Sequence, residues 1–193
     1  MEVTPKEARE LLGQTDAIAE VMRNHLMYRR IGPVLILWGI IWIICFPLTG
    51  LLPAYSGWIW LIGDCIGFAG SGLNARRCAS PIRSASSSIM RSRILWFWVV
   101  LLAYGCVWMF LIAPAGNSRA VLFIVTLIMF AYVAMGLLAR INFMTWLGVG
   151  VTILAMVGYG LFANKPLVLN VWMGITGGLA LLATGIFLHL RAR

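Results

Sequence analysis

The sequence predicts an all-helical, polytopic membrane protein with six transmembrane helices and an amphipathic helix in front of them. Hydrophobic residues make up 62% of the 193 residues and charged residues only 11%. Soluble domains contain about 45–50% apolar and about 25% charged residues. A soluble globule of this length has too little interior to hide so much apolar surface. The composition therefore disfavours a soluble enzyme, a disordered chain and a disulfide scaffold.

Six apolar stretches have the length that crosses a bilayer, about 17–25 residues. Their breaks coincide with Pro53, Pro114 and the sequence Asn164-Lys165-Pro166, and proline ends helices readily. Every backbone polar group inside hydrocarbon needs an internal hydrogen-bond partner, so these spans are expected to be helices. The predicted spans are 31–50, 54–73, 94–113, 120–138, 143–162 and 167–190.

The distribution of Lys and Arg predicts the orientation. With six spans and a cytoplasmic N-terminus, all of the 15 basic residues except Arg119 and Lys165 fall on the cytoplasmic side. This bias follows the positive-inside rule and places both termini in the cytoplasm. We expect the protein in a bacterial inner membrane. The net charge of +9 is then explained mainly by topology and by attraction to anionic lipid headgroups.

A basic cytoplasmic loop is predicted at 74–93, between the second and third spans. Its composition favours contact with lipid headgroups or with a partner protein. It contains no aromatic residue on which a base could stack, so nucleic-acid binding is not expected. The arginines of this predicted contact are Arg76, Arg77, Arg83, Arg91 and Arg93.

Consecutive spans pair into three stretches of similar length, at about 30–76, 93–140 and 142–191. Two of them end alike, with GLNAR at 72–76 and GLLAR at 136–140. A tandem repeat of helical hairpins explains this pattern. The alternative is that glycine and a terminal arginine are simply common at cytoplasmic span ends.

This span layout, with the runs WLGVG at 146–150 and GITGG at 174–178, resembles the HdeD-like group of small bacterial membrane proteins. The resemblance covers about residues 31–190 and implies three tandem hairpins. The chain is also similar in style to uncharacterised bacterial membrane proteins that carry a short cytoplasmic helix before their spans. Neither resemblance implies a catalytic residue, and the N-terminal helix departs from the HdeD-like pattern.

Residues 1–30 are predicted to form a cytoplasmic amphipathic helix, separate from a transmembrane domain at 31–193. Thr4, Pro5 and Glu7 have the spacing of a capping box with proline in the first turn. An apolar stripe follows, from Ala8 to Leu26. Acidic residues outnumber basic ones over 1–27, which disfavours anchoring to anionic lipid. The stripe is expected to dock on the protein's own cytoplasmic face, on another subunit or on a partner.

Asp64, next to Cys65, is the one acidic residue in any predicted span. An ionisable residue inside a membrane is costly and is a functional candidate. Two hypotheses stay open: a proton or cation site, or a neutral carboxyl that hydrogen-bonds between helices. Possible partners on other spans are Thr126, Tyr132, Tyr159, Thr152 and Thr176. Gly63 and Gly67 flank it with small-xxx-small spacing, which allows a second helix to approach closely. Gly174 and Gly178 have the same spacing in the sixth span.

No metal, cofactor or catalytic site is predicted. The four cysteines and two histidines lack metal-ligand spacing, and the histidines, His25 and His189, both fall near the predicted cytoplasmic face, so no pair of them lies within the spans. Trp38 and Trp42 share one helix face and either pack in the core or line a cavity for an aromatic or lipid-like ligand.

The sequence therefore favours a non-enzymatic accessory or regulatory subunit that assembles with itself or with a larger membrane complex. The alternative is a small transporter or channel with Asp64 as its proton or cation site.

Overall fold

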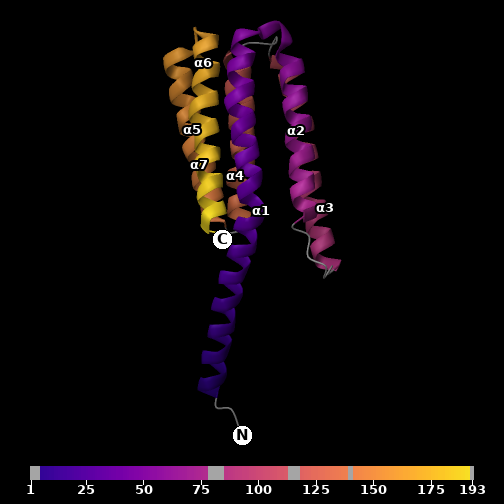
Figure 1. The fold of residues 1–193 in the computed structure, drawn as a ribbon, viewed down its shortest axis with the longest axis vertical. Coiled ribbons are helices and arrows are strands. Elements are labelled where there is room, and N and C mark those ends of the chain that lie inside the picture. The colour runs from indigo at the N-terminus through magenta and orange to yellow at the C-terminus, as the bar shows by residue number, and fades with distance from the viewer. Residues whose placement is uncertain (1–4, 78–84, 113–117, 139–140, 192–193) are drawn as a thin grey trace.

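The computed structural model describes the backbone of residues 5–77, 85–112, 118–138 and 141–191, and the side chains of 27–77, 92–111, 118–138 and 141–191. Throughout these residues the chain is helical or in short turns, so the predicted all-helical class is confirmed (Figure 1). The elements are α1 (Pro5–Leu51), the short 3-10 helix η1 (Pro53–Tyr55), α2 (Ser56–Arg77), α3 (Ala85–Ile112), α4 (Ser118–Leu138), α5 (Asn142–Phe162), α6 (Pro166–Trp172), the π-helix η2 (Met173–Gly177) and α7 (Gly178–Arg191).

Five helical segments are long and apolar enough to cross a membrane. They are Met27–Leu51, Ser92–Leu111, Ser118–Leu138, Asn142–Phe162 and Pro166–Arg191. The second predicted span corresponds to α2, which is 22 residues long but is not one of these five. Asp64 and the glycines and serines of α2 lower its mean hydropathy. A sixth span therefore stays a prediction.

The predicted cytoplasmic helix and the predicted first span form one continuous helix, α1, which begins at Pro5. The helix continues through the change from polar to apolar composition near residue 30. Pro33 and Pro47 also lie inside α1, although proline removes a helical donor. The packing predicted for the stripe from Ala8 to Leu26 lies outside the described side chains.

The last apolar segment, Pro166–Arg191, contains a π-helical turn between two α-helices. Pro166 occupies the first turn of α6, which suits its missing N–H group. The wider turn η2 follows, and α7 continues the same span to Arg191. π-Helices are rare and occur mostly as single turns inside α-helices.

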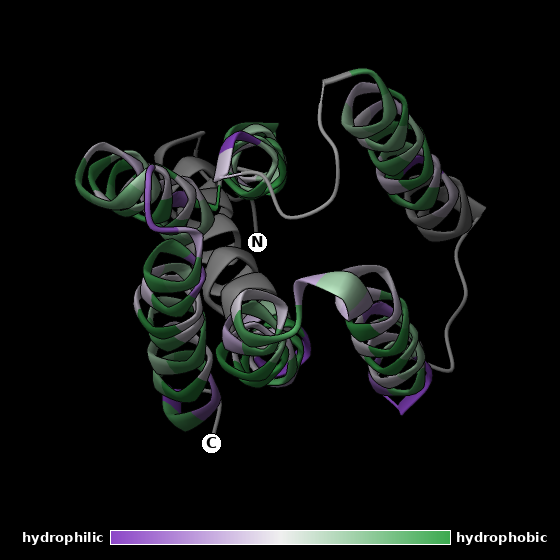
Figure 2. Ribbon diagram, turned by 90° about the horizontal axis from the view of Figure 1, so that it is seen from above, coloured by the Kyte–Doolittle hydropathy of each residue, from purple (hydrophilic) through white to green (hydrophobic). Residues whose placement is uncertain are grey.

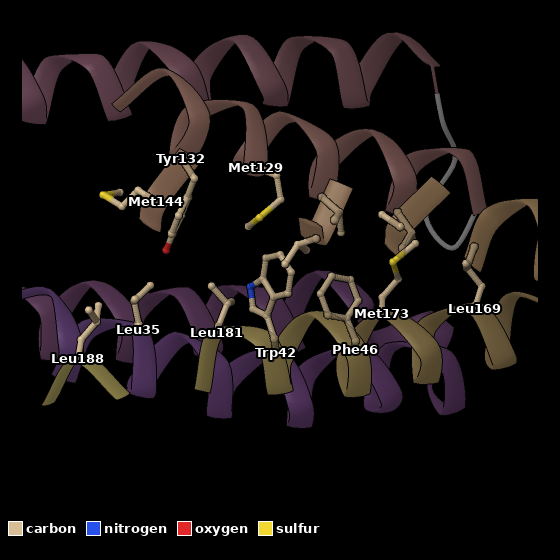
Figure 3. Packing of buried hydrophobic residues seen from close by; sticks show 14 of the residues in the cluster. Leu35, Trp42, Phe46, Met129, Tyr132, Met144, Leu169, Met173, Leu181 and Leu188 are labelled. Atoms are coloured by element: carbon tan, nitrogen blue, oxygen red, sulfur yellow. The ribbon is translucent and has the colours of Figure 1, made fainter. Parts of the chain in front are cut away.

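The core lies where α1 and the last span face α4 and α5. Figure 3 shows Trp42 and Phe46 of α1 with Met173 of η2 on one side and Met129 of α4 on the other. Trp42, Phe46 and Met173 are each 2% exposed. The buried cluster consists of Leu35, Trp42, Phe46, Val121, Val125, Met129, Tyr132, Ile141, Met144, Val151, Ala155, Leu169, Met173, Leu181 and Leu188.

The helices α2 and α3 stand to one side of this core (Figure 2). Among the described residues, α2 contacts α1 and η1, and α3 contacts α4. The most extensive packing joins α1 with α7 and α4 with α5, which belong to different predicted hairpins. The contacts therefore do not single out three hairpins, and that arrangement stays a prediction.

Candidate functional site

Asp64 lies half-buried on α2, at the level where α2 packs against Cys45 of α1. The Cys45 thiol is 3.9 Å from the carbonyl oxygen of Ile59, one turn before Gly63. A Cβ atom on Gly63 would lie only 2.8 Å from Cys45 Sγ. The missing side chain of Gly63 therefore brings α1 close to α2 beside Asp64, whose carboxyl is within electrostatic range of the thiol.

The Asp64 carboxyl has no hydrogen-bond or ion-pair partner among the described residues. The three threonine hydroxyl groups proposed as partners bond within their own helices instead, and no hydrogen bond joins Tyr132 or Tyr159 to Asp64 among the described residues. Thr126 donates to Leu122, Thr152 to Gly148 and Thr176 to Trp172, over 2.7–2.9 Å. Cys65, the other half of the candidate polar site, is exposed and unpaired. The structure thus places Asp64 directly after Gly63, the α2 residue that packs on Cys45, and it shows no bond from the three threonine hydroxyl groups to Asp64.

Small residues continue the α1–α2 contact away from Asp64. The ring of Trp38 lies over Gly67, where a Cβ atom would be 2.6 Å from it. The Trp38 indole N–H donates to Ser71 Oγ over 3.2 Å, and the ring makes an edge contact with Phe68. Gly63 and Gly67 are buried residues of α2, and both face α1.

The far end of α2 is joined to α1 near a proline. The Asn74 amide donates to the carbonyl oxygen of Arg30 over 2.8 Å. Pro33 has no N–H group for the carbonyl oxygen of Arg29, the residue just before Arg30. The Asn74 amide therefore joins α2 to α1 next to the helical bond that Pro33 removes.

Gly174 and Gly178 both face α1. A Cβ atom on Gly174 would lie 2.8 Å from the Pro47 ring, and one on Gly178 would lie 3.0 Å from Gly39 O. The glycines on the α1 side of this contact were not predicted from the sequence. They are Gly39 and Gly32, the latter of which meets Gly185 of α7. The seven-residue spacing of Gly32 and Gly39, matched by Gly178 and Gly185, is the signal that could have revealed it.

The two tryptophans proposed as a ligand surface face different neighbours. Trp42 is buried in the core, with Gly177 of η2 against its ring and Phe46 in edge contact at 5.2 Å. Trp38 faces α2. Both tryptophans therefore contact neighbouring helices, as expected for core packing.

Several arginines gather at one end of the helices, which we call the basic end. In Figure 1 the end of α2, the start of α3 and the end of α7 all point toward this end, with α7 on the other side of α1 from α2 and α3. Arg83 and the side chain of Arg91 lie outside the described residues. Arg119 and Lys165, at the start of α4 and before α6, belong to the opposite end. The described arginines of the basic end are all exposed: Arg29, Arg30, Arg76, Arg77, Arg93 and Arg191.

Three buried polar residues escaped the sequence analysis. Thr49 and Asn170 donate to carbonyl oxygens one turn earlier in their own helices, over 2.8 Å. Ser118 donates to the carbonyl oxygen of Ala163 over 2.7 Å and so joins the start of α4 to the end of α5. The Oδ1 atom of Asn170 is buried and has no hydrogen-bond partner among the described residues.

No group of three or more His, Cys, Asp or Glu side chains that could hold a metal ion occurs among the described residues. The described cysteines, Cys45, Cys65 and Cys106, are unpaired.

The chain matches no protein-family model, no curated protein and no solved structure. The resemblance to the HdeD-like group therefore stays a prediction, and function has to be argued from the geometry.

Proposed function

We propose that the chain is a non-enzymatic accessory or regulatory membrane protein that assembles with a second copy or with a larger membrane complex. The proposal includes six membrane spans: the five apolar helical segments given above and α2. It also includes a bacterial cytoplasmic membrane in which the basic end and both termini are cytoplasmic. The clustering of exposed arginines at one end supports this orientation.

The loose attachment of α3 carries the proposal. Only 6% of its apolar span is buried within the chain, against 28–39% for the other four spans. Its described contacts are with α4, through the edge contact of Trp98 with Tyr132 and the packing of Gly105 on Leu127. Helices in lipid associate by close packing. A span with so little packing inside its own chain is the natural surface for another protein.

The neighbouring α2 extends the same flank. Its buried residues, Gly63 and Gly67, face α1, and the rest of its surface is largely exposed. Both α2 and α3 have many exposed apolar side chains, and Figure 2 shows the two helices on the same side of the molecule. The flank formed by α2 and α3 is therefore our assembly surface.

Cysteine cross-linking in native membranes tests the assembly. Cys106 is exposed on α3, so a variant that retains it as the single cysteine reports on the flank. Ile153 is 56% exposed on α5, and Ile153→Cys in a cysteine-free background is the matched control. We expect a bismaleimide cross-link to a second copy or a defined partner through Cys106 and none through the control. Monomer alone with both probes would contradict the proposal.

A small transporter or channel is the second candidate function. It is favoured by one observation: Asp64 is a half-buried carboxyl in an apolar helix, without a hydrogen-bond partner among the described residues. A proton flux measured in liposomes under a potassium diffusion potential tests it. An accessory protein gives no flux above empty liposomes. A flux that Asp64→Asn abolishes would replace the first proposal with the second.

A further inference from the structure

A groove between α1 and α2 opens at the basic end. Its volume is about 250 Å³. Small-molecule pockets usually measure about 300–1,000 Å³, so the groove fits part of a ligand rather than a whole large one. Its apolar wall is formed by Pro33, Val34, Leu37, Gly70 and Leu73.

Polar groups stand at the rim of this groove. Asn74 and Arg77 of α2 complete its lining, and Arg77 is exposed at the last position of the helix. The Arg77 guanidinium makes no ion pair within the part of the chain that the structure describes. Its planar set of donors suits phosphate oxygens.

The charge around the rim has one sign. Arg29 and Arg30 on α1 and Arg76 on α2 are exposed at the same end of the two helices. The one acidic side chain that the structure describes, Asp64, is 13 residues before Arg77, which is roughly 20 Å along the helix. An anionic group at the rim would therefore meet several positive charges and no described negative charge.

An apolar wall beneath a cationic rim, at the level where span ends meet headgroups, matches the chemistry of a phospholipid. Basic pockets between transmembrane helices on the cytoplasmic side are typical sites for anionic headgroups. The limited volume agrees with such a ligand, because the remainder of an acyl chain stays in the bilayer.

We propose that this groove binds one anionic phospholipid. The phosphate lies on Arg77, and the first methylene groups of one chain lie on Leu37 and Leu73. The bound lipid bridges α1 and α2 at the end where Asn74 already joins them. Since α2 is held to the described chain through α1 and η1, the lipid acts as a clamp on α2.

The inference rests on the membrane placement proposed above but not on assembly. Lipid binding and Cys106 cross-linking are separate measurements, so either can fail while the other holds.

Lipid binding to the purified full chain, measured by native mass spectrometry, tests the proposal. The probes are phosphatidylglycerol, phosphatidylcholine with the same acyl chains, and inorganic phosphate. We expect one phosphatidylglycerol to bind at least tenfold more tightly than phosphatidylcholine. Inorganic phosphate should compete weakly, because it cannot use the apolar wall. Equal competition by free phosphate would overturn the lipid assignment.

Two substitutions in the groove, Arg77→Gln and Leu73→Trp, and one control outside it, Arg191→Gln, locate the site. Arg77→Gln is expected to weaken phosphatidylglycerol binding about tenfold, the loss typical of one charge-assisted hydrogen bond. Arg191→Gln removes the same charge at the same end but outside the groove, where Arg191 lies 4.5 Å from the Phe187 ring, and is expected to change binding less than about twofold. Leu73→Trp fills the groove, keeps Arg77 and should also weaken binding. Equal effects of Arg77→Gln and Arg191→Gln, or an unchanged affinity for Leu73→Trp, would overturn the proposal.

Discussion

Gly39 of α1 and Gly178 of α7 bring their helices into backbone contact. A Cβ atom on Gly39 would lie 2.8 Å from the carbonyl oxygen of Gly178 and 2.7 Å from the backbone nitrogen of Leu182. Neither atom belongs to a side chain that could rotate away. A methyl group at residue 39 therefore has to push α1 and α7 apart.

Gly39→Ala is predicted to destabilise the protein by about 1–3 kcal/mol, the usual cost of overpacking. The measurement is unfolding of the purified protein in mixed detergent micelles. Gly150→Ala is the matched control, since nothing lies within 4 Å of a Cβ atom there. A methyl group at this helical position should be neutral or stabilise by up to about 1 kcal/mol. Equal losses in both variants would contradict a backbone contact at Gly39.

The helical class and most helix positions follow from the sequence, because length and hydropathy alone decide them. The third predicted span, 94–113, differs by two residues at each end from the apolar segment Ser92–Leu111. The fifth, 143–162, differs by one residue from Asn142–Phe162. Pro53 and Pro166 stand at the first positions of η1 and α6, where a missing donor is harmless.

The helix partners did not follow from the sequence. Apolar residues that face lipid and apolar residues that face protein have the same hydropathy. The amino-acid composition of α3 therefore does not indicate how little it packs against the rest of the chain. Gly178 was visible as a packing residue, but its partner Gly39 lies 139 residues away in the sequence. A π-helix adds a residue within a continuous apolar run, and η2 therefore also escaped the sequence analysis.

The indole of Trp38 and the hydroxyl of Ser71 are predicted to couple energetically. Their 3.2 Å hydrogen bond joins α1 to α2. Interhelical hydrogen bonds in membrane proteins contribute about 0.6 kcal/mol on average and at most about 1.7. A double-mutant cycle with Trp38→Phe and Ser71→Ala should give a coupling in this range. The pair Trp172→Phe and Ser71→Ala is the control, because Trp172 donates to Leu154 instead. Additive losses in the first cycle would show that the bond contributes nothing.

Steric compensation is predicted beside Asp64. Gly63→Ala places a methyl group 2.8 Å from Cys45 Sγ and should destabilise by about 1–3 kcal/mol. Cys45→Ala removes that sulfur atom, so Gly63→Ala should be better tolerated in a Cys45→Ala background. Gly72→Ala, with open space around it on the same helix, is the control and should behave alike in both backgrounds. The same loss for Gly63→Ala in both backgrounds would contradict the contact.

Whether α2 crosses the membrane is tested by labelling each of its ends. Six spans place Gly57 and Lys165 outside and Arg77 and Arg191 in the cytoplasm. In a cysteine-free background, Gly57→Cys and Lys165→Cys should react with a membrane-impermeant maleimide on intact bacterial cells. Arg77→Cys and Arg191→Cys should react only after the cells are permeabilised. Both ends of α2 reacting from the same side would show that α2 does not cross the bilayer. With five spans the chain ends would then lie on opposite sides, which the reaction of Arg191→Cys on intact cells would report.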